Sequence, residues 1–357
     1  MLEVLNSWYR KYFSDPQAVI LTVILVVGFT VVLTMGKMLT PVLAAVVIAY
    51  LLEGIVRYLQ QHNVPRLLAV ILVFIAFFVF VVFLFFGVVP VLSSQVASFI
   101  REMPQLLSVA RDSLMQLPEY YDYISEKQVQ DITDRLDREI ATTGQHILTF
   151  SLTSIPGLIT MLVYLILMPL LVFFFLKDKA PILNWFSSLL PQERSLASRV
   201  WRDMDLQLGN YVRGKFWEIL IVGGVTYVSF AILDLKYAIL LAALVGVSVL
   251  VPYIGAAVVT IPVALVAYFQ FGWGMDFAIV LIVYGIIQAL DGNVLVPLLF
   301  SEVVNLHPIA IIVSVLVFGG LWGFWGVFFA IPLATLVNAL LRAWPRVPEA
   351  DATPEES

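Results

Sequence analysis

Cysteine is absent from the 357-residue chain, and charged residues are scarce. The absence of cysteine excludes disulfides and cysteine-ligated metal sites. Charged residues make up 13% of the chain and hydrophobic residues 61%, with a mean hydropathy of +0.97. Ordinary soluble domains carry about 25% charged residues. The chain therefore has more apolar surface than a soluble fold can bury, and lipid must cover the excess.

Segments that alternate polar and apolar residues, as in transmembrane barrels, are also lacking. Instead, runs of about 18 or more apolar residues recur along the chain, close to the roughly 20 residues with which a helix crosses a bilayer. The sequence therefore predicts an all-α integral membrane protein. The first apolar run has no small-residue cleavage site, so we expect an uncleaved span rather than a secretory signal.

The hydropathy pattern divides the chain into six parts. We expect an N-terminal cytoplasmic stretch with three spans (1–90, with spans at 18–36, 39–56 and 67–90), an external acidic helical insertion (91–154), a fourth span (155–176), a cytoplasmic amphipathic helical segment (177–215), a C-terminal membrane core (216–343, beginning with a span at 216–235) and a disordered cytoplasmic tail (344–357).

Basic residues indicate the orientation, because Lys and Arg in short loops are retained on the cytoplasmic side. With the N-terminus inside, 13 of the 20 Lys and Arg residues lie in cytoplasmic segments. Five of the other seven lie in the long 91–154 segment, and long segments translocate largely regardless of charge. We therefore expect both termini in the cytoplasm and an even number of crossings.

The 91–154 segment carries nine acidic and five basic residues, yet it has the pattern of a folded domain. Apolar residues recur at helical spacing over 129–147, Ser125 and Gln128 form a capping box, and Pro104 and Pro118 are expected to separate this helix from earlier ones. Two roles stay open. The segment is either a solvated helical cap on the membrane domain or neighbouring subunits, or an acidic surface that gathers cations.

The 177–215 segment contains an amphipathic helix. Its apolar residues recur at every fourth position: Leu196, Val200, Met204, Leu208 and Val212. Aromatic and basic residues on the other faces predict that this helix lies along the inner membrane surface before it turns into the next span. It acts either as a structural coupling helix or as a moving element that links gating to transport.

Two apolar runs in the C-terminal core are too long for one straight span. Residues 237–270 would form a helix of roughly 50 Å, against a hydrocarbon core of about 30 Å. Pro252 and Gly255 predict a break there, because proline lacks a backbone donor and glycine adopts angles that other residues avoid. In the second run, 308–342, we expect the break at a group of glycines: Gly319, Gly320, Gly323 and Gly326.

The two runs also share a short pattern. Ile261-Pro262 and Ile331-Pro332 lie 70 residues apart, each after a glycine and a predicted break, which indicates an internal repeat. Paired interrupted segments are a sequence pointer to a transporter binding site, because half-helix ends and unwound carbonyls line a cavity. The alternative is that Gly and Pro only allow close helix packing.

Asp291 is the leading candidate for a functional residue, because an ionisable group at membrane depth usually faces a cavity or a partner. Its carboxylate could be neutral in one state and charged or ion-bound in another, with Gln288 and Asn293 as neutral ligands. The alternative is that Asp291 caps the following segment at the aqueous boundary through Asn293. Glu218 and Asp234 lie near the ends of their predicted span, and we expect both at the membrane interface.

Five stretches, in this order along the chain, resemble the signature of the AI-2E (autoinducer-2 exporter) family of transporters. They are 209–215 (Gly-Asn-Tyr-Val-Arg-Gly-Lys), 251–255 (Val-Pro-Tyr-Ile-Gly), 291–297 (Asp-Gly-Asn-Val-Leu-Val-Pro), 306–308 (Leu-His-Pro) and 326–332 (Gly-Val-Phe-Phe-Ala-Ile-Pro). Residues 8–10 and 13–16 resemble the PerM permease branch of this family. The likeness covers nearly the whole chain.

The resemblance implies a bacterial inner-membrane protein with about eight transmembrane or re-entrant segments and a homo-oligomeric assembly, with a pentamer expected. Family members are assigned export of autoinducer-2 or sodium/proton antiport, so the substrate does not follow from the family. The residues carried over by family position are Tyr253, Gly255, Asp291, Asn293, Pro297 and His307. Many relatives have a different small residue between the acidic residue and Asn, and Gly292 could loosen that turn.

These observations together predict two sets of site residues. The substrate or ion pathway would comprise Gln288, Asp291, Asn293, Tyr253 and His307. Helix breaks or gates would lie at Pro252, Gly255, Gly292, Pro297, Gly323, Gly326 and Pro332. We expect no metal site and no cofactor beyond a coupling ion, H⁺ or Na⁺. The expected partners are membrane lipid and a small-molecule or ion substrate, without nucleic acid.

Gradient-driven export or antiport of a small solute or cation is the function that the sequence favours. No P-loop pattern is present, so ATP would have to act through a separate subunit. An intramembrane hydrolase would use the Gly-Val-Ser-Val sequence at 246–249 with His307, but neither has a specific context, and we do not expect an enzyme. A non-transporting envelope scaffold that binds a partner through its external domain stays open, as does a passive channel.

Overall fold

The computed structural model describes residues 16–115, 130, 155–188, 195–300 and 306–343, and no strand occurs among them. The N-terminal half forms α2 (Pro16–Gln61), α3 (Arg66–Phe83), a π-type turn η1 (Leu84–Val88), α4 (Val89–Met115), α7 (Ile155–Lys177) and α8 (Lys179–Ser188). The C-terminal half forms α9 (Ser195–Ile232), α10 (Ala238–Ser248), α11 (Ile254–Phe271), α12 (Met275–Leu290), η2 (Asp291–Leu295), α13 (Val296–Phe300), α14 (Pro308–Trp322), α15 (Phe324–Phe328) and α16 (Ala330–Ala343). The predicted all-α fold is confirmed.

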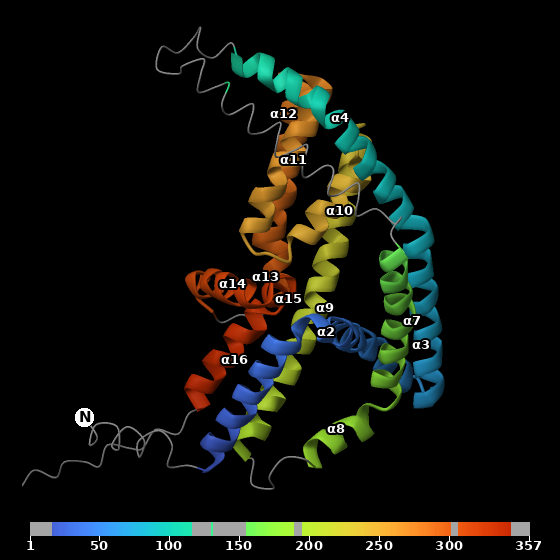
Figure 1. Cartoon of the computed structure of the whole chain (residues 1–357), viewed down its shortest axis with the longest axis vertical. Helices are drawn as coiled ribbons and strands as arrows, with labels where there is room; N and C mark the ends of the chain where they lie inside the picture. Colours follow the sequence, from blue (N-terminus) through green and yellow to red (C-terminus); the bar gives the residue numbers. More distant parts are fainter. Residues whose placement is uncertain (1–15, 116–129, 131–154, 189–194, 301–305, 344–357) are drawn as a thin grey trace, which may run out of the picture.

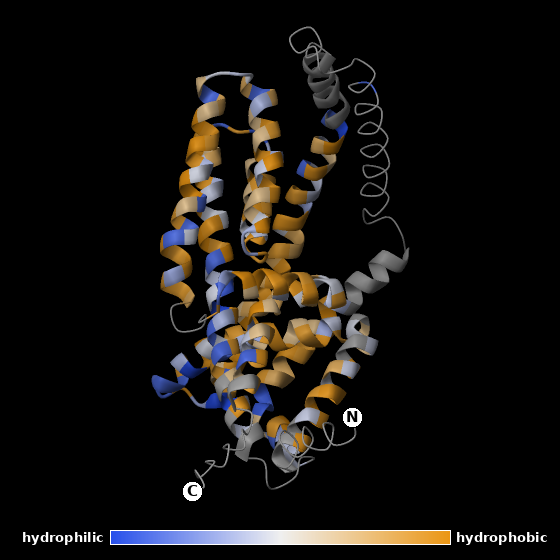
Figure 2. Ribbon diagram, turned by 90° about the vertical axis from the view of Figure 1, so that its left-hand side faces the viewer, coloured by the Kyte–Doolittle hydropathy of each residue, from blue (hydrophilic) through white to orange (hydrophobic). Residues whose placement is uncertain are grey.

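Five of the described helical stretches are long and apolar enough to cross a membrane. They are Met38–Gln61, Arg66–Glu102, Val200–Ile232, Ile254–Phe271 and Met275–Phe300. Shorter apolar helices accompany them, including Tyr164–Lys177, Ala238–Ser248 and Pro308–Trp322. Figure 2 shows that hydrophobic residues make up most of the helices, with hydrophilic residues most frequent in the lower part and at helix ends. The chain is therefore a multi-pass membrane protein.

Helix α9 runs along most of the length of the molecule and packs against helices of both the N-terminal and the C-terminal half. In Figure 1, α10, α11 and α12 lie beside its upper part, α13, α14 and α15 lie at mid-height, and α2 and α16 lie near its lower part. Helices α9 and α10 approach closely because Gly246 packs directly against Gly223 and the backbone carbonyl of Ile219. Small residues at such a contact let two backbones meet within a membrane.

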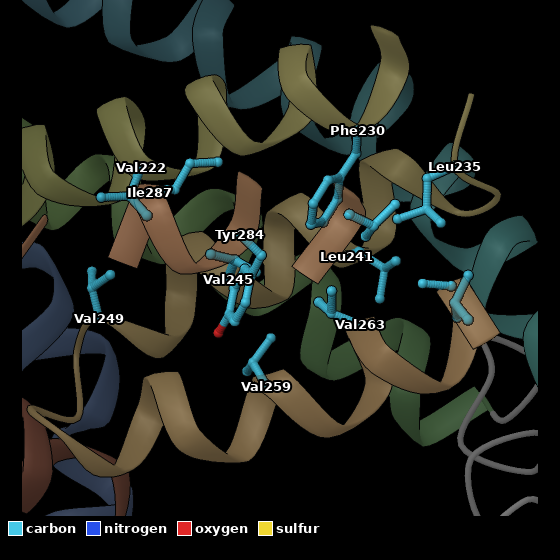
Figure 3. Packing of buried hydrophobic residues seen from close by; sticks show 13 residues of the cluster. Val222, Phe230, Leu235, Leu241, Val245, Val249, Val259, Val263, Tyr284 and Ile287 are labelled. Atoms are coloured by element: carbon cyan, nitrogen blue, oxygen red, sulfur yellow. The ribbon is translucent and has the colours of Figure 1, made fainter. Parts of the chain in front are cut away.

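Three apolar clusters hold these layers together. The largest joins α9, α10, α11 and α12 around the buried side chains Phe230, Leu241, Val263 and Tyr284, as Figure 3 shows. A second cluster joins α2, α3 and α7, with Val56, Val70 and Val172 fully buried. The third joins the middle of α9 to α13, α14, α15 and α16. The first and third clusters meet at Val249 and Leu250, directly after the end of α10.

Several predicted boundaries were wrong. The predicted spans 18–36 and 39–56 form one helix, α2, which is bent near its middle (Figure 1) and contains Pro41. Helix α4 continues through Pro104, which therefore separates nothing. The amphipathic helix does not turn along the membrane surface, because α9 runs without interruption from Ser195 into the following span. The capping box at Ser125 and Gln128 and the expected break at Pro118 lie outside the described residues.

Candidate functional site

The first predicted break is present between α10 and α11. Helix α10 ends at Ser248, and α11 begins at Ile254 after a turn that contains Pro252. Tyr253 has a φ of +63°, a left-handed conformation that non-glycine residues rarely adopt. Gly255 packs so tightly against the carbonyl of Ser248 that a Cβ atom there would overlap its oxygen. The break is therefore built by a strained turn and a close contact that only glycine permits.

The second break lies between α14 and α16, as predicted, but not at every expected glycine. Gly323 has a φ of +58° and ends α14, whereas Gly319 and Gly320 lie inside that helix. Gly326, in α15, packs against the carbonyl of Phe318 so that a Cβ atom would overlap its oxygen. Gly255 and Gly326 thus make the same contact, each with the carbonyl of a preceding helix. This equivalence supports the predicted internal repeat.

Two side chains of α9 bind carbonyls at these two breaks. The Tyr211 hydroxyl donates to the Phe328 carbonyl at 2.8 Å, and Lys215 Nζ donates to the Val249 carbonyl at 2.8 Å. Residues four apart lie on one helix face. Both donors are buried, and both acceptors lie where a helix has ended and its last carbonyls lack helical partners. One face of α9 therefore connects the two interrupted segments.

Lys215 also forms a buried ion pair. Its Nζ lies 2.7 Å from Glu218 Oε2, and the two side chains are only 5% and 2% exposed. Both residues lie within Val200–Ile232, a helical stretch that is long and apolar enough to cross a membrane. The ammonium lies 5.2 Å from the centroid of the Phe300 ring, against which Gly214 also packs. Withdrawing two charges from water costs several kcal/mol for each ion, so a pair at this depth indicates a function beyond packing.

Asp291 lies beside this pair, at the point where α12 passes into η2. Its carboxylate interacts electrostatically with both Lys215 and Glu218. Among the described residues, Asp291 Oδ1 and Gln288 Nε2 are buried and have no hydrogen-bond partner. With two carboxylates and one ammonium, the group has a net charge of one negative when fully ionised. Lys215, Glu218, Gln288 and Asp291, with the Val249 carbonyl, are called the charged site below.

The backbone at Asp291 is a π-type turn of five residues, not a helix end. Such turns insert one extra residue into a helix and are frequent at functional sites. Asn293 Nδ2 donates to the Ala289 carbonyl at 2.8 Å and is exposed, so the alternative in which Asp291 caps a segment through Asn293 does not match the structure. Gly292 is exposed with open space around it.

The remaining predicted residues lie elsewhere. His307 is the N-cap of α14, where its Nδ1 accepts a hydrogen bond from the Ile309 amide at 3.3 Å. Tyr253 is 61% exposed on the turn of the first break. Pro332 lies in the first turn of α16, where proline is tolerated, whereas Pro297 lies inside the continuous helical stretch Met275–Phe300, directly after the π-type turn η2. The structure brings Gln288 and Asp291 together but does not add these four residues to them.

The sequence prediction did not include Lys215 or Glu218 in the site. Glu218 was expected at the membrane interface because the span was predicted to start at residue 216; α9 is continuous through this position, and the Glu218 side chain is buried against Lys215. Asp234 does follow the last turn of α9, where its carbonyl accepts a hydrogen bond from Gln270 Nε2 at 2.6 Å. The spacing of Tyr211, Lys215 and Glu218 was a usable signal, since it puts all three on one face of a helix.

The groups considered for a hydrolase are used in other ways. The Ser248 hydroxyl donates to the Val245 carbonyl of its own helix at 2.7 Å. His307 caps the start of a different helix. Neither arrangement is that of a nucleophile with an adjacent base.

Comparison with known proteins gives a consistent result. The family model described as "AI-2E family transporter" matches residues 20–346. The chain is 49% identical over 346 residues to the protein named "Putative permease PerM" from Escherichia coli (strain K12), covering 97% of this chain and 98% of the relative. It is 24% identical over 329 residues to "AI-2 transport protein TqsA" from the same strain, covering 90% of this chain and 92% of that protein.

Proposed function

Because the chain belongs to the AI-2E family of transporters, we propose that it is a permease that moves a small solute or cation by gradient-driven secondary transport, as export or antiport. The observation that carries this proposal is the charged site. It combines a buried ion pair, a further carboxylate with an unpaired oxygen, and the carbonyl of a broken helix, all within the membrane-spanning part of the chain.

The charged site has the features that ion coupling requires. Two carboxylates share one ammonium, so the site can accept one further cation, either H⁺ or Na⁺, and become neutral. Neutralisation lowers the cost of exposing the group to apolar surroundings during a conformational change. Carboxylate, amide and carbonyl oxygens are also suitable ligands for a hard cation. Asp291 is the proposed coupling residue, with Glu218 as its electrostatic partner and Lys215 as the internal counter-ion.

The helix breaks supply the means for a conformational change. Lys215 and Tyr211 bind one carbonyl at each break, so loading of the charged site and the positions of both interrupted segments are connected through α9. A change in the charge of Asp291 or Glu218 alters the attraction on Lys215 and hence its bond to Val249. We propose that this connection couples ion binding to opening of the substrate path.

The proposed location is the bacterial inner membrane with both termini in the cytoplasm. The first turns of α2 and the last turns of α16 lie toward the same, lower end of the molecule (Figure 1), which agrees with an even number of crossings. The basic residues Arg57, Arg66 and Lys179 lie at helix ends near the connections α2–α3 and α7–α8. The positive-inside rule assigns such short connections to the cytoplasm. A homo-oligomer, with a pentamer expected, is part of the same proposal.

The test uses the purified full chain in sealed vesicles with an imposed proton or sodium gradient, while internal pH and a panel of small solutes are followed. Asp291→Asn is compared with the wild type and with Asp276→Asn, a matched control. Asp276 is exposed in the first turn of the same helix, α12. We expect gradient-dependent movement in the wild type and the control, and its loss in Asp291→Asn.

Other outcomes distinguish the alternatives. Downhill flux without any gradient-driven accumulation, in wild type and Asp291→Asn alike, would identify a passive channel. Equal gradient-driven flux in wild type and Asp291→Asn would contradict the coupling role. If no species moves in any vesicle, the result would favour the alternative of a non-transporting scaffold that binds a partner through the 91–154 segment.

A further inference from the structure

Four charged side chains meet where three membrane helices end or begin on one side of the molecule. Glu53 and Arg57 lie on the last turns of α2, Arg66 is the first residue of α3, and Lys179 is the first residue of α8, immediately after α7. Glu53 Oε1 lies 3.5 Å from Arg57 Nε and 3.2 Å from Lys179 Nζ, while its Oε2 lies 3.6 Å from Arg66 Nη2. These four residues are called the basic cluster.

The basic cluster has more positive charge than it neutralises internally. Three cations surround one carboxylate, which leaves two positive charges in excess. The Glu53 side chain is only 10% exposed, whereas those of Arg57, Arg66 and Lys179 are 62%, 40% and 31% exposed. The carboxylate therefore lies beneath the cations, and the unneutralised charge faces outward.

The cations are also held in place before any ligand arrives. Arg66 Nη2 donates to the Leu176 carbonyl near the end of α7 at 2.9 Å, in addition to its ion pair with Glu53. Glu53 in turn connects α2 with the start of α8 through its hydrogen bond from Lys179. Because the side chains are already ordered, less conformational entropy is lost when an anion binds them.

The surroundings of the basic cluster are those of a headgroup at the edge of a bilayer. Directly after Arg66, the apolar residues Leu67, Leu68 and Leu72 of α3 are more than half exposed, as expected for a face covered by acyl chains. On the other side, Trp185 and Phe186 of α8 are 59% and 56% exposed. Aromatic residues of this kind concentrate at the level of lipid headgroups.

We infer that the basic cluster binds the phosphate of an anionic phospholipid, with Arg57, Arg66 and Lys179 around the headgroup and the acyl chains along the exposed leucines of α3. Basic pockets between transmembrane helices recognise anionic headgroups in this way. In the proposed orientation the lipid belongs to the cytoplasmic leaflet. A free phosphate ion would meet the cations equally well, but it would leave the adjacent apolar face of α3 unused.

The inference is tested by native mass spectrometry of the full chain in detergent, titrated with phosphatidylglycerol or with phosphatidylcholine of the same acyl chains. The double variant Arg57→Gln/Lys179→Gln removes the two cations that do not also hold the α7 carbonyl. We expect it to bind phosphatidylglycerol about 30-fold more weakly than the wild type, since each basic residue near a headgroup strengthens binding about five- to sixfold. Arg57→Lys/Lys179→Arg keeps both charges and should retain binding.

Arg202→Gln is the matched control, because Arg202 is an exposed arginine of α9 outside the basic cluster. It should change phosphatidylglycerol binding by less than about twofold. Equal binding of phosphatidylcholine and phosphatidylglycerol by the wild type would overturn the inference, as would unchanged binding in the double variant. Displacement of the lipid by millimolar inorganic phosphate would show a site for the free ion and would also overturn it.

Discussion

Removing Lys215 should destabilise the protein by leaving Glu218 charged and buried. At 2.7 Å the two charges attract each other by about 6 kcal/mol for an effective dielectric constant of ~20. Breaking a buried ion pair by deleting one partner costs about 3–5 kcal/mol, because the other charge stays without compensation. Lys215→Met also removes the donor to the Val249 carbonyl. We therefore expect its free energy of unfolding to fall by about 3–5 kcal/mol.

Glu218→Gln should destabilise the protein less than Lys215→Met, because Lys215 still donates to the Val249 carbonyl and still has the nearby Asp291 carboxylate as a counter-charge. The expected loss is about 1–3 kcal/mol. In the double variant Lys215→Met/Glu218→Gln the Glu218 charge is gone and only Asp291 loses its counter-ion. The loss should therefore be smaller than the sum of the single losses by about 2–3 kcal/mol.

The assay is reversible unfolding in mixed micelles with increasing sodium dodecyl sulfate, followed by fluorescence of the eight tryptophans. Arg202→Met, an exposed cation lost from the same helix, should change the unfolding free energy by less than about 0.5 kcal/mol. Additive losses in the double variant, or a Lys215→Met variant as stable as the control, would show that Lys215 and Glu218 are not energetically coupled.

Three further predictions concern the helix breaks and the start of α14. Gly255→Ala and Gly326→Ala should each lower the free energy of unfolding by about 1–3 kcal/mol, because the added methyl group overlaps a backbone carbonyl. Gly292→Ala is the control and should have no such effect, because the space around Gly292 is open. Equal melting temperatures for all three variants would contradict the close contacts of Gly255 and Gly326. Tyr211→Phe should lose about 1–3 kcal/mol by leaving the Phe328 carbonyl unpaired, measured by the same unfolding assay; no loss would show that water or another donor replaces it. His307→Ala should reduce stability by about 1 kcal/mol through loss of the cap of α14 while gradient-driven flux stays at the wild-type level; selective loss of flux would instead return His307 to the pathway.

The helix breaks could be predicted from the sequence because they depend on local backbone chemistry. Pro252 cannot continue a helix, and an apolar run as long as 237–270 cannot cross a bilayer straight, so a break near Pro252 follows from the chain alone. The particular turn glycine of the second break did not follow. Gly319, Gly320, Gly323 and Gly326 are all candidates by composition, and only the backbone angle shows that Gly323 makes the turn.

The partners in the charged site could not be predicted, because they are brought together by tertiary packing. Asp291 and Gln288 share a helix, and their depth in an apolar stretch marked them as functional. Lys215 meets Val249, 34 positions later, only because α9 packs along α10. The burial of Glu218 depends on the continuity of α9, which the change from an amphipathic to an apolar pattern concealed.

Helix continuity was the weakest prediction in general. A polar residue such as Lys37 between two apolar runs indicates a loop, yet α2 is helical through this position. Polar side chains at the middle of a long helix can lie at the membrane surface, and nothing in local sequence distinguishes that case from a turn. Lysine is a good helix former and does not end a helix. The boundary predicted between residues 36 and 39 rested on the hydropathy pattern alone.

The most direct test of ion coupling records charge movement in proteoliposomes on a solid-supported membrane after a sudden rise in H⁺ or Na⁺ concentration. It needs no knowledge of the substrate, because loading of a buried carboxylate moves charge by itself. We expect a transient current in the wild type and in Asp276→Asn that is absent in Asp291→Asn, with each variant reconstituted at equal density. A current of wild-type size in Asp291→Asn would contradict the coupling role of Asp291, because the coupling ion would then bind elsewhere.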